Sequence, residues 1–275
     1  MTLKTLLDSA QQGLHPACAT CVCRPAPARR IAFGVSCLKH GLNWHSDGKA
    51  VSFQISQDPA GTTPERTGCL CAVCNSANST DHSAQQGIAL WRAGVWRDSD
   101  SDGGAMYLAS HYWTNAVMHG ANDGQLEAAR NSCSAVLDDQ LLASSPQVII
   151  AGGKVAAQSL HQIAVLKQPW SSLRHALRRG AYSERTTLRN GEPATVFVTY
   201  HASARSVNQT VSALYGDDVE VILDRRLAAL PTAGEARRFL RRYDRASTTG
   251  RGMRLLLLHW FDIGTAVRHA HGATA

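Results

Sequence analysis

The feature that most constrains the fold is an apolar run that stops abruptly. Residues 50–56 are rich in the β-branched and aromatic side chains of a buried strand, and Gln57, Asp58 and Pro59 follow them directly. Proline has no N–H to donate to a β-ladder, so the strand must end near Asp58. The sequence therefore predicts a carboxylate at the carboxyl end of a buried strand. In an open parallel sheet, this is the edge where ligands bind.

Further apolar runs alternate with segments of helical periodicity. Strands separated by helices imply right-handed parallel crossovers. We therefore predict an α/β fold, a three-layer sandwich around a four-stranded parallel sheet. Besides the first strand, the predicted strands are 107–113, 147–151 and 194–200, and the predicted helices between them are 84–95, 125–142 and 155–166.

The two ends of the chain add helices to this core. The N-terminus reads as an amphipathic helix over 1–14 with Leu3, Leu6 and Leu7 on one face, followed by a loop containing cysteines. We expect residues 1–215 to form the α/β domain and 216–275 to form a helical extension packed on the same domain. Within 206–275 the predicted helices are 206–215, 219–230 and the basic 234–243, and the closing segment 250–271 has no assignment.

Charge and apolar content limit the function classes. The 275 residues include 28 Lys and Arg against 21 Asp and Glu, a net charge of +7. This charge favours a polyanionic partner, although the basic stretch 225–242 is equally explained as a solvated helix face. The longest apolar cluster, 255–261, is far shorter than the ~18 residues of a membrane span, and no secretory signal is evident. We expect a cytoplasmic protein without membrane contact, whose eight cysteines are thiols or metal ligands.

Reactive side chains follow the predicted strands, so a parallel sheet would bring Asp58, Asn115 and His201 to one edge. Asp58 can orient a water and stabilise positive charge, Asn115 can pair with a base edge, and His201 can hydrogen-bond an oxygen that gains charge. This set suits a hydrolysis in which water attacks a carbon and a heterocycle leaves as an anion. Taken singly, Asp58 is better explained as a turn former, Asn115 as a helix cap and His201 as a satisfied loop histidine, and it is their coincidence at three strand ends that favours a site.

A glycine pair follows the strand at 147–151. Gly152, Gly153 and Lys154 lead from this strand into a helix, whose N-terminal N–H groups are a plausible seat for a phosphate. Many turns from strand to helix use glycine for geometry alone, so both interpretations stay open.

Two groups of cysteines have spacings of interest. Cys18 and Cys21 form a C-x2-C pair, the spacing that presents two sulfurs to one metal. The second group can bind zinc or line a tight loop as small buried thiols. Its members are Cys69, Cys71 and Cys74, with His82 nearby.

Several segments together resemble the uracil-DNA glycosylase superfamily, and in particular its iron-sulfur branch, family 4. TNAV at 114–117 is similar to that branch's T-N-x-V segment, and PQVIIAGGKVAAQSL at 146–160 to its P-x-I-I-x-x-G-x-x-A-A segment. TYHAS at 199–203 resembles the late H-P-S motif, and QDP at 57–59 looks more like family 1. The resemblance covers about 18–205.

The resemblance implies roles for individual residues. Asp58 would position the attacking water within the motif shared with Gln57 and Pro59, Asn115 would read the uracil edge, and His201 would stabilise the uracil oxyanion. Ser203 and Arg205 would contact the minor groove or fill the space of the flipped nucleotide. Cys71 lies where family 4 carries the aromatic residue that stacks on uracil.

The resemblance also implies a 4Fe-4S cluster. Its four ligand places fall on Cys18, Cys21, His119 and Cys133. Ligation by histidine is chemically allowed in such clusters. Zinc, no metal, or replacement of the histidine by Cys23 remain alternatives.

We therefore expect a monomeric DNA glycosylase that hydrolyses the N-glycosidic bond of uracil, or of a related deaminated base, by base flipping and water activation. One alternative is a family member that binds damaged or single-stranded DNA without turnover. Another is an interaction module that carries a metal and has lost its active site.

Overall fold

The structure is a computed structural model that describes most of the chain. The described residues are 13–22, 50–57, 111–117, 124–201, 210–230, 233–270 and 272, together with Leu3, Thr5, Leu6 and Ser9. The strands are β1 (Ser52–Ser56), β2 (His111–Asn115), β3 (Val148–Gly152), β4 (Tyr182–Thr187) and β5 (Pro193–Thr199). The helices are α4 (Leu126–Ser144), α5 (Lys154–Gln162), α6 (Trp170–Leu173), α7 (Asp217–Ala228), α8 (Ala233–Leu240) and α9 (Thr248–Ala270), with 3-10 turns η1 (Pro16–Cys18), η5 (Ala176–Arg178) and η7 (Ser212–Leu214).

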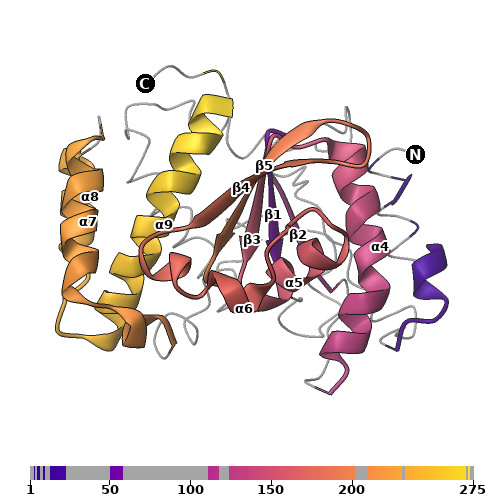
Figure 1. The fold of residues 1–275 in the computed structure, drawn as a ribbon, viewed down its shortest axis with the longest axis horizontal. Helices are drawn as coiled ribbons and strands as arrows, with labels where there is room; N and C mark the ends of the chain where they lie inside the picture. The colour runs from indigo at the N-terminus through magenta and orange to yellow at the C-terminus, as the bar shows by residue number, and fades with distance from the viewer. Residues whose placement is uncertain are drawn as a thin grey trace, which may run out of the picture.

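The strands form one five-stranded mixed sheet in the order β2-β1-β3-β5-β4, with helices packed around it (Figure 1). The four strands β2, β1, β3 and β5 run parallel to one another, as the sequence predicts. β4 is antiparallel to β5, and this fifth strand corrects the prediction of a four-stranded parallel sheet.

The sequence does not predict β4, because this strand has no apolar run. Its sequence is YSERTT, and only Thr186 is buried within it. It forms a hairpin with β5, whose turn is closed by the Leu188 N–H donating to the Glu192 carbonyl at 2.8 Å, with Gly191 at a φ of 87°. An edge strand needs only one buried face, so its polar composition fits its place.

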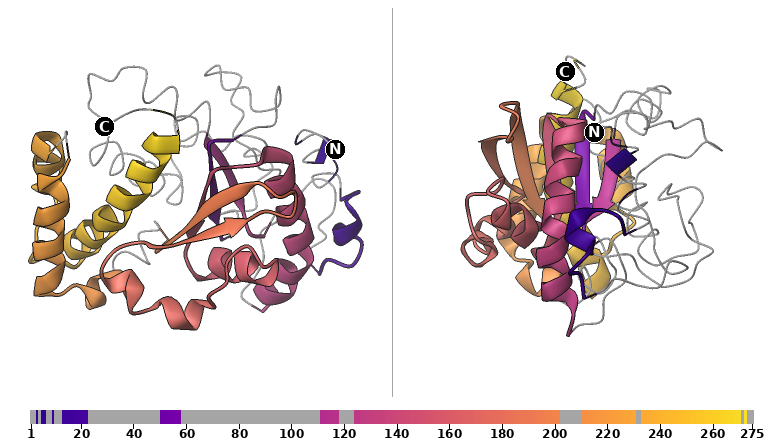
Figure 2. Two further views of the ribbon diagram at one scale, coloured as in Figure 1. Left: turned by 45° about the horizontal axis from the view of Figure 1, so that its top comes forward. Right: turned by 90° about the vertical axis from the view of Figure 1, so that its right-hand side faces the viewer.

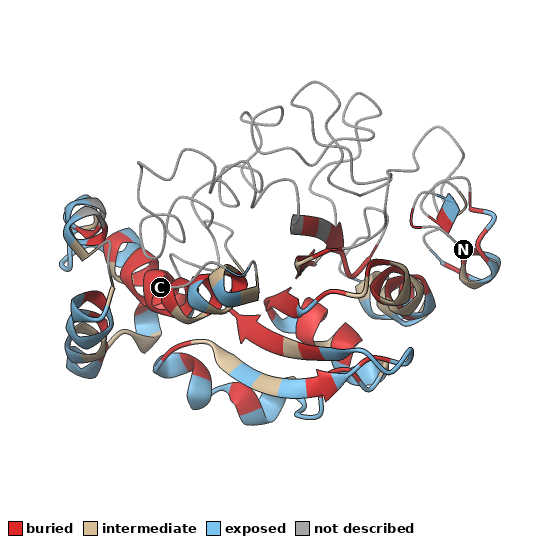
Figure 3. Ribbon diagram, turned by 90° about the horizontal axis from the view of Figure 1, so that it is seen from above, coloured by how far each residue is buried: buried red, intermediate tan, exposed pale blue. Residues whose placement is uncertain are grey.

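The central strands supply the core (Figure 3). Every residue of β1 and β3 is buried, which explains the almost continuous apolar sequence of β3, whereas β1 also buries Ser52, Gln54 and Ser56. The rings of Phe53 and Tyr112 lie 4.7 Å apart between β1 and β2. The Tyr112 hydroxyl donates to Gln140 Oε1 at 3.2 Å, which connects β2 to α4.

Several predicted helices are confirmed with changed limits. α4 matches the prediction closely, whereas α5 ends at Gln162 because Ala164 has a left-handed φ of 59°. Leu3 and Leu6 are helical and buried, but Leu14 is exposed and outside a helix. The predicted helix 84–95 lies outside the described residues.

The closing segment, unassigned from sequence, is the long helix α9. Fourteen of its 23 residues are buried, so it has no broad polar face. α9 lies between the sheet and the α7–α8 pair, and it packs on β3, β5 and α7 (Figures 1 and 2). None of the helices in the described ranges combines the length and apolarity needed to cross a membrane.

One buried histidine connects α9 to the sheet. His259 Nε2 lies 2.8 Å from the Leu177 carbonyl oxygen, and Nδ1 lies 3.0 Å from Thr199 Oγ1. A carbonyl only accepts, so Nε2 carries the proton and Nδ1 accepts from the threonine hydroxyl. Burial lowers the pKa of His259 to about 4, although its bond to Leu177 acts in the opposite direction.

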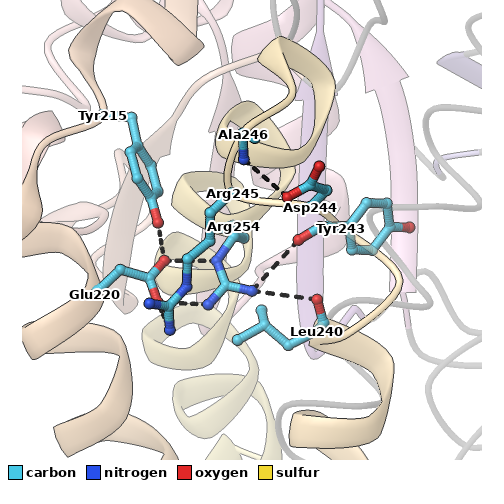
Figure 4. A network of polar contacts seen from close by, with 8 residues as sticks. All are labelled: Tyr215, Glu220, Leu240, Tyr243, Asp244, Arg245, Ala246 and Arg254. Atoms are coloured by element: carbon cyan, nitrogen blue, oxygen red, sulfur yellow. Dashed lines mark hydrogen bonds and ion pairs between the residues drawn. The ribbon is translucent and has the colours of Figure 1, made fainter.

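A second polar group holds the three C-terminal helices together (Figure 4). Arg254 of α9 is 5% exposed, and its Nε and Nη2 each lie 2.5 Å from a carboxylate oxygen of Glu220 on α7. Its Nη1 donates to the Leu240 carbonyl at 3.2 Å, at the end of α8. Glu220 also accepts from the Tyr215 hydroxyl and pairs with Arg245. The pair of Glu220 and Arg254 therefore links α7, α8 and α9.

We predict that His259 makes stability depend on pH below neutrality. Its folded pKa of about 4 lies below the ordinary 6.5, so the unfolded chain binds more protons between these values. Stability should be complete above pH 6.5 and fall by up to about 3 kcal/mol toward pH 4. Urea unfolding at several pH values measures this loss. It should shrink in His259→Gln and persist in His269→Gln, an exposed histidine of the same helix; equal losses in all three proteins would contradict the assignment.

We also predict that Glu220→Met destabilises the protein by about 3–5 kcal/mol, because it leaves the Arg254 guanidinium buried without a counter-charge. The matched control is Arg226→Met, which removes the more exposed pair between Arg226 and Asp262, at 3.3 Å and also between α7 and α9. This control should cost about 0–1 kcal/mol. Equal small losses in urea unfolding would show that the Glu220 network is not a structural anchor.

Candidate active site at the carboxyl edge of the sheet

The carboxyl ends of the four parallel strands meet at one edge. The Ala116 N–H donates to the Ser56 carbonyl at 2.8 Å, and the Val117 N–H donates to the Gln57 carbonyl at 2.9 Å. These bonds hold the segment after β2 beside the segment after β1. Asp58 and Pro59 follow Gln57 in sequence but lie outside the described residues.

Asn115 is the last residue of β2, where it pairs with Ser56 of β1. Sequence reasoning expected it just after a strand that ends at 113. The residue is only 4% exposed, and its carboxamide makes no hydrogen bond to another described residue. A buried amide needs partners, so a base edge at this position would satisfy its donor and acceptor.

His201 follows β5 by two residues and lies against the turn after β3. A side chain added at Gly153 would place its Cβ 2.9 Å from the His201 Cβ, closer than real contacts allow. Gly153 also has a φ of +92°, which favours glycine. Burial lowers the pKa of His201, so the imidazole is neutral near pH 7 and keeps one N–H donor.

The end of β5 is held from two sides. The Gly153 N–H donates to the Thr199 carbonyl at 2.8 Å, and Thr199 Oγ1 bonds His259 of α9. Tyr200, which lies between Thr199 and His201 in sequence, has its ring centroid 5.2 Å from that of His259. The backbone that carries His201 is therefore fixed by α5 and by α9.

Positive charge lies close to the same strand end. Burial raises the pKa of the Tyr200 hydroxyl to about 12, and the guanidinium groups of Arg174 and Arg178 act in the opposite direction. Both arginines are exposed and belong to the segment around α6 and η5. Their charges would favour an anion formed near β5.

At the predicted phosphate site, both glycines already make contacts within the fold. Gly152 ends β3, where a Cβ would meet the Ile55 carbonyl oxygen at 3.2 Å, so its lack of a side chain serves close strand packing. The Gly153 N–H is directed to Thr199, as described above. Lys154, the first residue of α5, is exposed.

Three cysteines of the predicted cluster lie on neighbouring elements. Cys18 ends η1, which packs against α4, and His15 beside it lies 3.1 Å from Asp139 of that helix. Cys18, Cys21 and Cys133 are buried, with 7%, 8% and 4% exposure. The described residues nevertheless contain no group of three or more metal-ligating side chains that is close enough to hold an ion. The donor set visible here does not by itself form a metal centre.

The remaining predicted site residues fall outside the described ranges. They are Asp58, Pro59, Cys71, His119, Ser203 and Arg205, together with Cys23, Cys69, Cys74 and His82.

Sequence reasoning missed His259, which supports the end of β5. One signal was available, because a histidine inside the apolar run LLLLHWF must find buried hydrogen-bond partners. The sequence could not identify those partners, which lie 60 and 82 residues away.

Comparison with known proteins agrees with this geometry. The family model described as Uracil DNA glycosylase superfamily matches residues 74–219, just over half of the chain. The match includes Asn115, Gly153 and His201 but begins after Gln57. No curated protein matches the chain. On the family match, the chain belongs to the uracil DNA glycosylase superfamily.

Proposed function

We propose that the protein is a DNA glycosylase that hydrolyses the N-glycosidic bond of uracil, or of a related deaminated base, in DNA. The base would be flipped out of the stack, at a cost of a few kcal/mol that pocket and phosphate contacts must offset. We further propose that it acts as a monomer in the cytoplasm.

The observation that carries the proposal is the shared position of Asn115 and His201 at the carboxyl edge. Asn115 ends β2 and His201 follows β5, and these two strands are separated by three strand spacings, or about 14 Å. An asparagine, a pyrimidine ring and a histidine can together span that interval. The strand between them that precedes Asp58 is β1, so a water held by Asp58 would lie on the same edge.

The proposed roles follow from the chemistry of each group. The buried Asn115 carboxamide would pair with the base edge. The neutral His201 would donate a hydrogen bond to the base oxygen as the glycosidic bond breaks and charge develops there. Asp58 would orient the attacking water and stabilise the sugar cation. Cys71, Ser203 and Arg205 would complete the contacts with the flipped nucleotide.

The alternative, a member that binds DNA without turnover, is favoured by one sequence observation. Gly68, Cys69, Leu70 and Cys71 occupy the place of the family's stacking aromatic. Loss of such a partner forfeits about 1–3 kcal/mol of base stacking. The experiment below separates the two functions.

We expect purified protein to release uracil from oligonucleotides that carry a single lesion, with products measured as abasic sites. Asp58→Asn and His201→Gln should lower the single-turnover rate by about 10²–10³-fold. Gly153→Ala should also lower it, because the added Cβ displaces His201. Asp224→Asn and His269→Gln, at exposed positions, are the matched controls and should retain the rate.

No release from any lesion in a panel of deaminated bases would refute the proposal. DNA binding without release would favour the inactive alternative. Activity that persists in both Asp58→Asn and His201→Gln would refute the assigned roles even if the reaction itself is correct.

We also propose that Cys18, Cys21, His119 and Cys133 hold a 4Fe-4S cluster, with zinc as the alternative. Protein prepared without oxygen should be brown and contain about four irons per chain. Cys133→Ser should lose this iron and colour, whereas Cys37→Ser, outside the proposed ligand set, should retain both. A colourless preparation with neither iron nor zinc would contradict the proposal.

A further inference from the structure

The positive charge of the protein is concentrated in one short stretch. Residues 233–254, which form α8, the following turn and the start of α9, contain seven arginines and two acidic residues. This stretch alone therefore carries +5 of the net +7. It lies beyond the segment that matches the superfamily, which ends at 219.

Four arginines of α8 and of the turn directly after it lie on one exposed face. Arg237 and Arg241 are four residues apart, as are Arg238 and Arg242, so each pair lies on one side of the helix. Ala236 and Leu240, also four apart, are buried and turn the opposite side to the core. All four arginines are exposed. We call them the α8 basic face.

The α8 basic face is mounted on a fixed support. Arg254 donates to the Leu240 carbonyl at 3.2 Å and to the Tyr243 carbonyl at 3.5 Å, just past the end of α8. The same guanidinium binds Glu220 (Figure 4). The Arg241 N–H donates to the Arg237 carbonyl at 3.1 Å, which extends the helical turn as far as Arg241. The exposed arginines thus project from an ordered scaffold.

Like charges this close repel one another. Arg237 and Arg241 are about 6 Å apart along the helix axis, and such pairs destabilise a helix. No ion pair to a described acidic residue joins either of them. Binding of a polyanion would relieve the repulsion.

The chemistry favours DNA phosphates over a lipid surface. Guanidinium groups bind phosphate oxygens through two parallel hydrogen bonds. A helix that lies on a membrane needs large apolar side chains beside its cations. Among the residues whose burial the structure describes, the exposed large apolar side chains are Leu14, Val22 and Val221, which lie outside α8.

We propose that the α8 basic face is a second DNA-binding surface, which contacts the phosphates of duplex DNA independently of base recognition at the sheet edge. The proposal rests on the DNA substrate of the proposed function but not on its chemistry. It assigns a partner to a C-terminal region that the superfamily match does not cover.

The test measures binding to a uracil-free duplex of about 30 base pairs. Fluorescence anisotropy gives the binding constant at each of a series of salt concentrations. Each lost phosphate contact lowers the slope of log K against log salt by about 0.9. Arg237→Gln/Arg241→Gln should therefore flatten the slope by about 1.8. Arg237→Lys/Arg241→Lys retains the charge and should retain most of the slope.

The matched control is Lys167→Gln/Arg185→Gln, which removes the same charge from exposed positions before α6 and on β4. It should leave the slope unchanged. Three results would each overturn the proposal. The glutamine variant of α8 could bind like the wild type, the control variant could weaken binding equally, or the wild type could fail to bind the duplex. Binding to anionic vesicles is measured in parallel. A glutamine variant of α8 that loses vesicle binding but keeps duplex binding would also overturn the proposal. Because the duplex holds no uracil, the result is independent of whether the protein releases uracil.

Discussion

The placement of the candidate site depends on how the end of β5 is fixed. Thr199 bonds through its carbonyl to the Gly153 N–H at 2.8 Å and through its hydroxyl to His259 at 3.0 Å. A strand end held by its backbone alone can still tilt, whereas a second bond from the side chain to another element removes that freedom. His201, two residues further on, therefore has a defined position against Gly153 before any ligand binds, which is the preorganisation that a catalytic hydrogen bond requires.

The parallel core could be predicted because its central strands β1 and β3 are buried on both faces. Apolar sequence, strand length and the helices between strands all indicate the same arrangement there. β4 could not be predicted in this way, since its side chains alternate between solvent and one covered face and YSERTT resembles a loop. Its pairing with β5 depends on the hairpin turn around Gly191, a contact that periodicity does not report.

α9 illustrates the opposite difficulty. A surface helix shows a polar stripe, but α9 is covered on several sides by β3, β5 and α7, so its sequence shows apolar residues nearly all round. Gly250, Gly252 and Gly264 further reduce its helical propensity. For the site, sequence placed Asn115 and His201 at one edge by topology alone. It could not show that Gly153 is required by the His201 Cβ, because that contact joins residues 48 apart.

Two buried polar residues of α9 contact different parts of the structure. His259 contacts the strand end at the candidate site, and Arg254 contacts the other C-terminal helices. His259 faces the sheet and is kept neutral by burial, while Arg254, little more than one turn earlier, remains paired with Glu220 and faces α7 and α8. A neutral group suffices at β5 because its partners are a hydroxyl and a carbonyl. A charge is tolerated at α7 because a carboxylate meets it there. One rigid helix therefore connects the strand end that carries His201 to the support of the α8 basic face. Although the superfamily match ends at 219, α9 belongs structurally to the sheet that it covers.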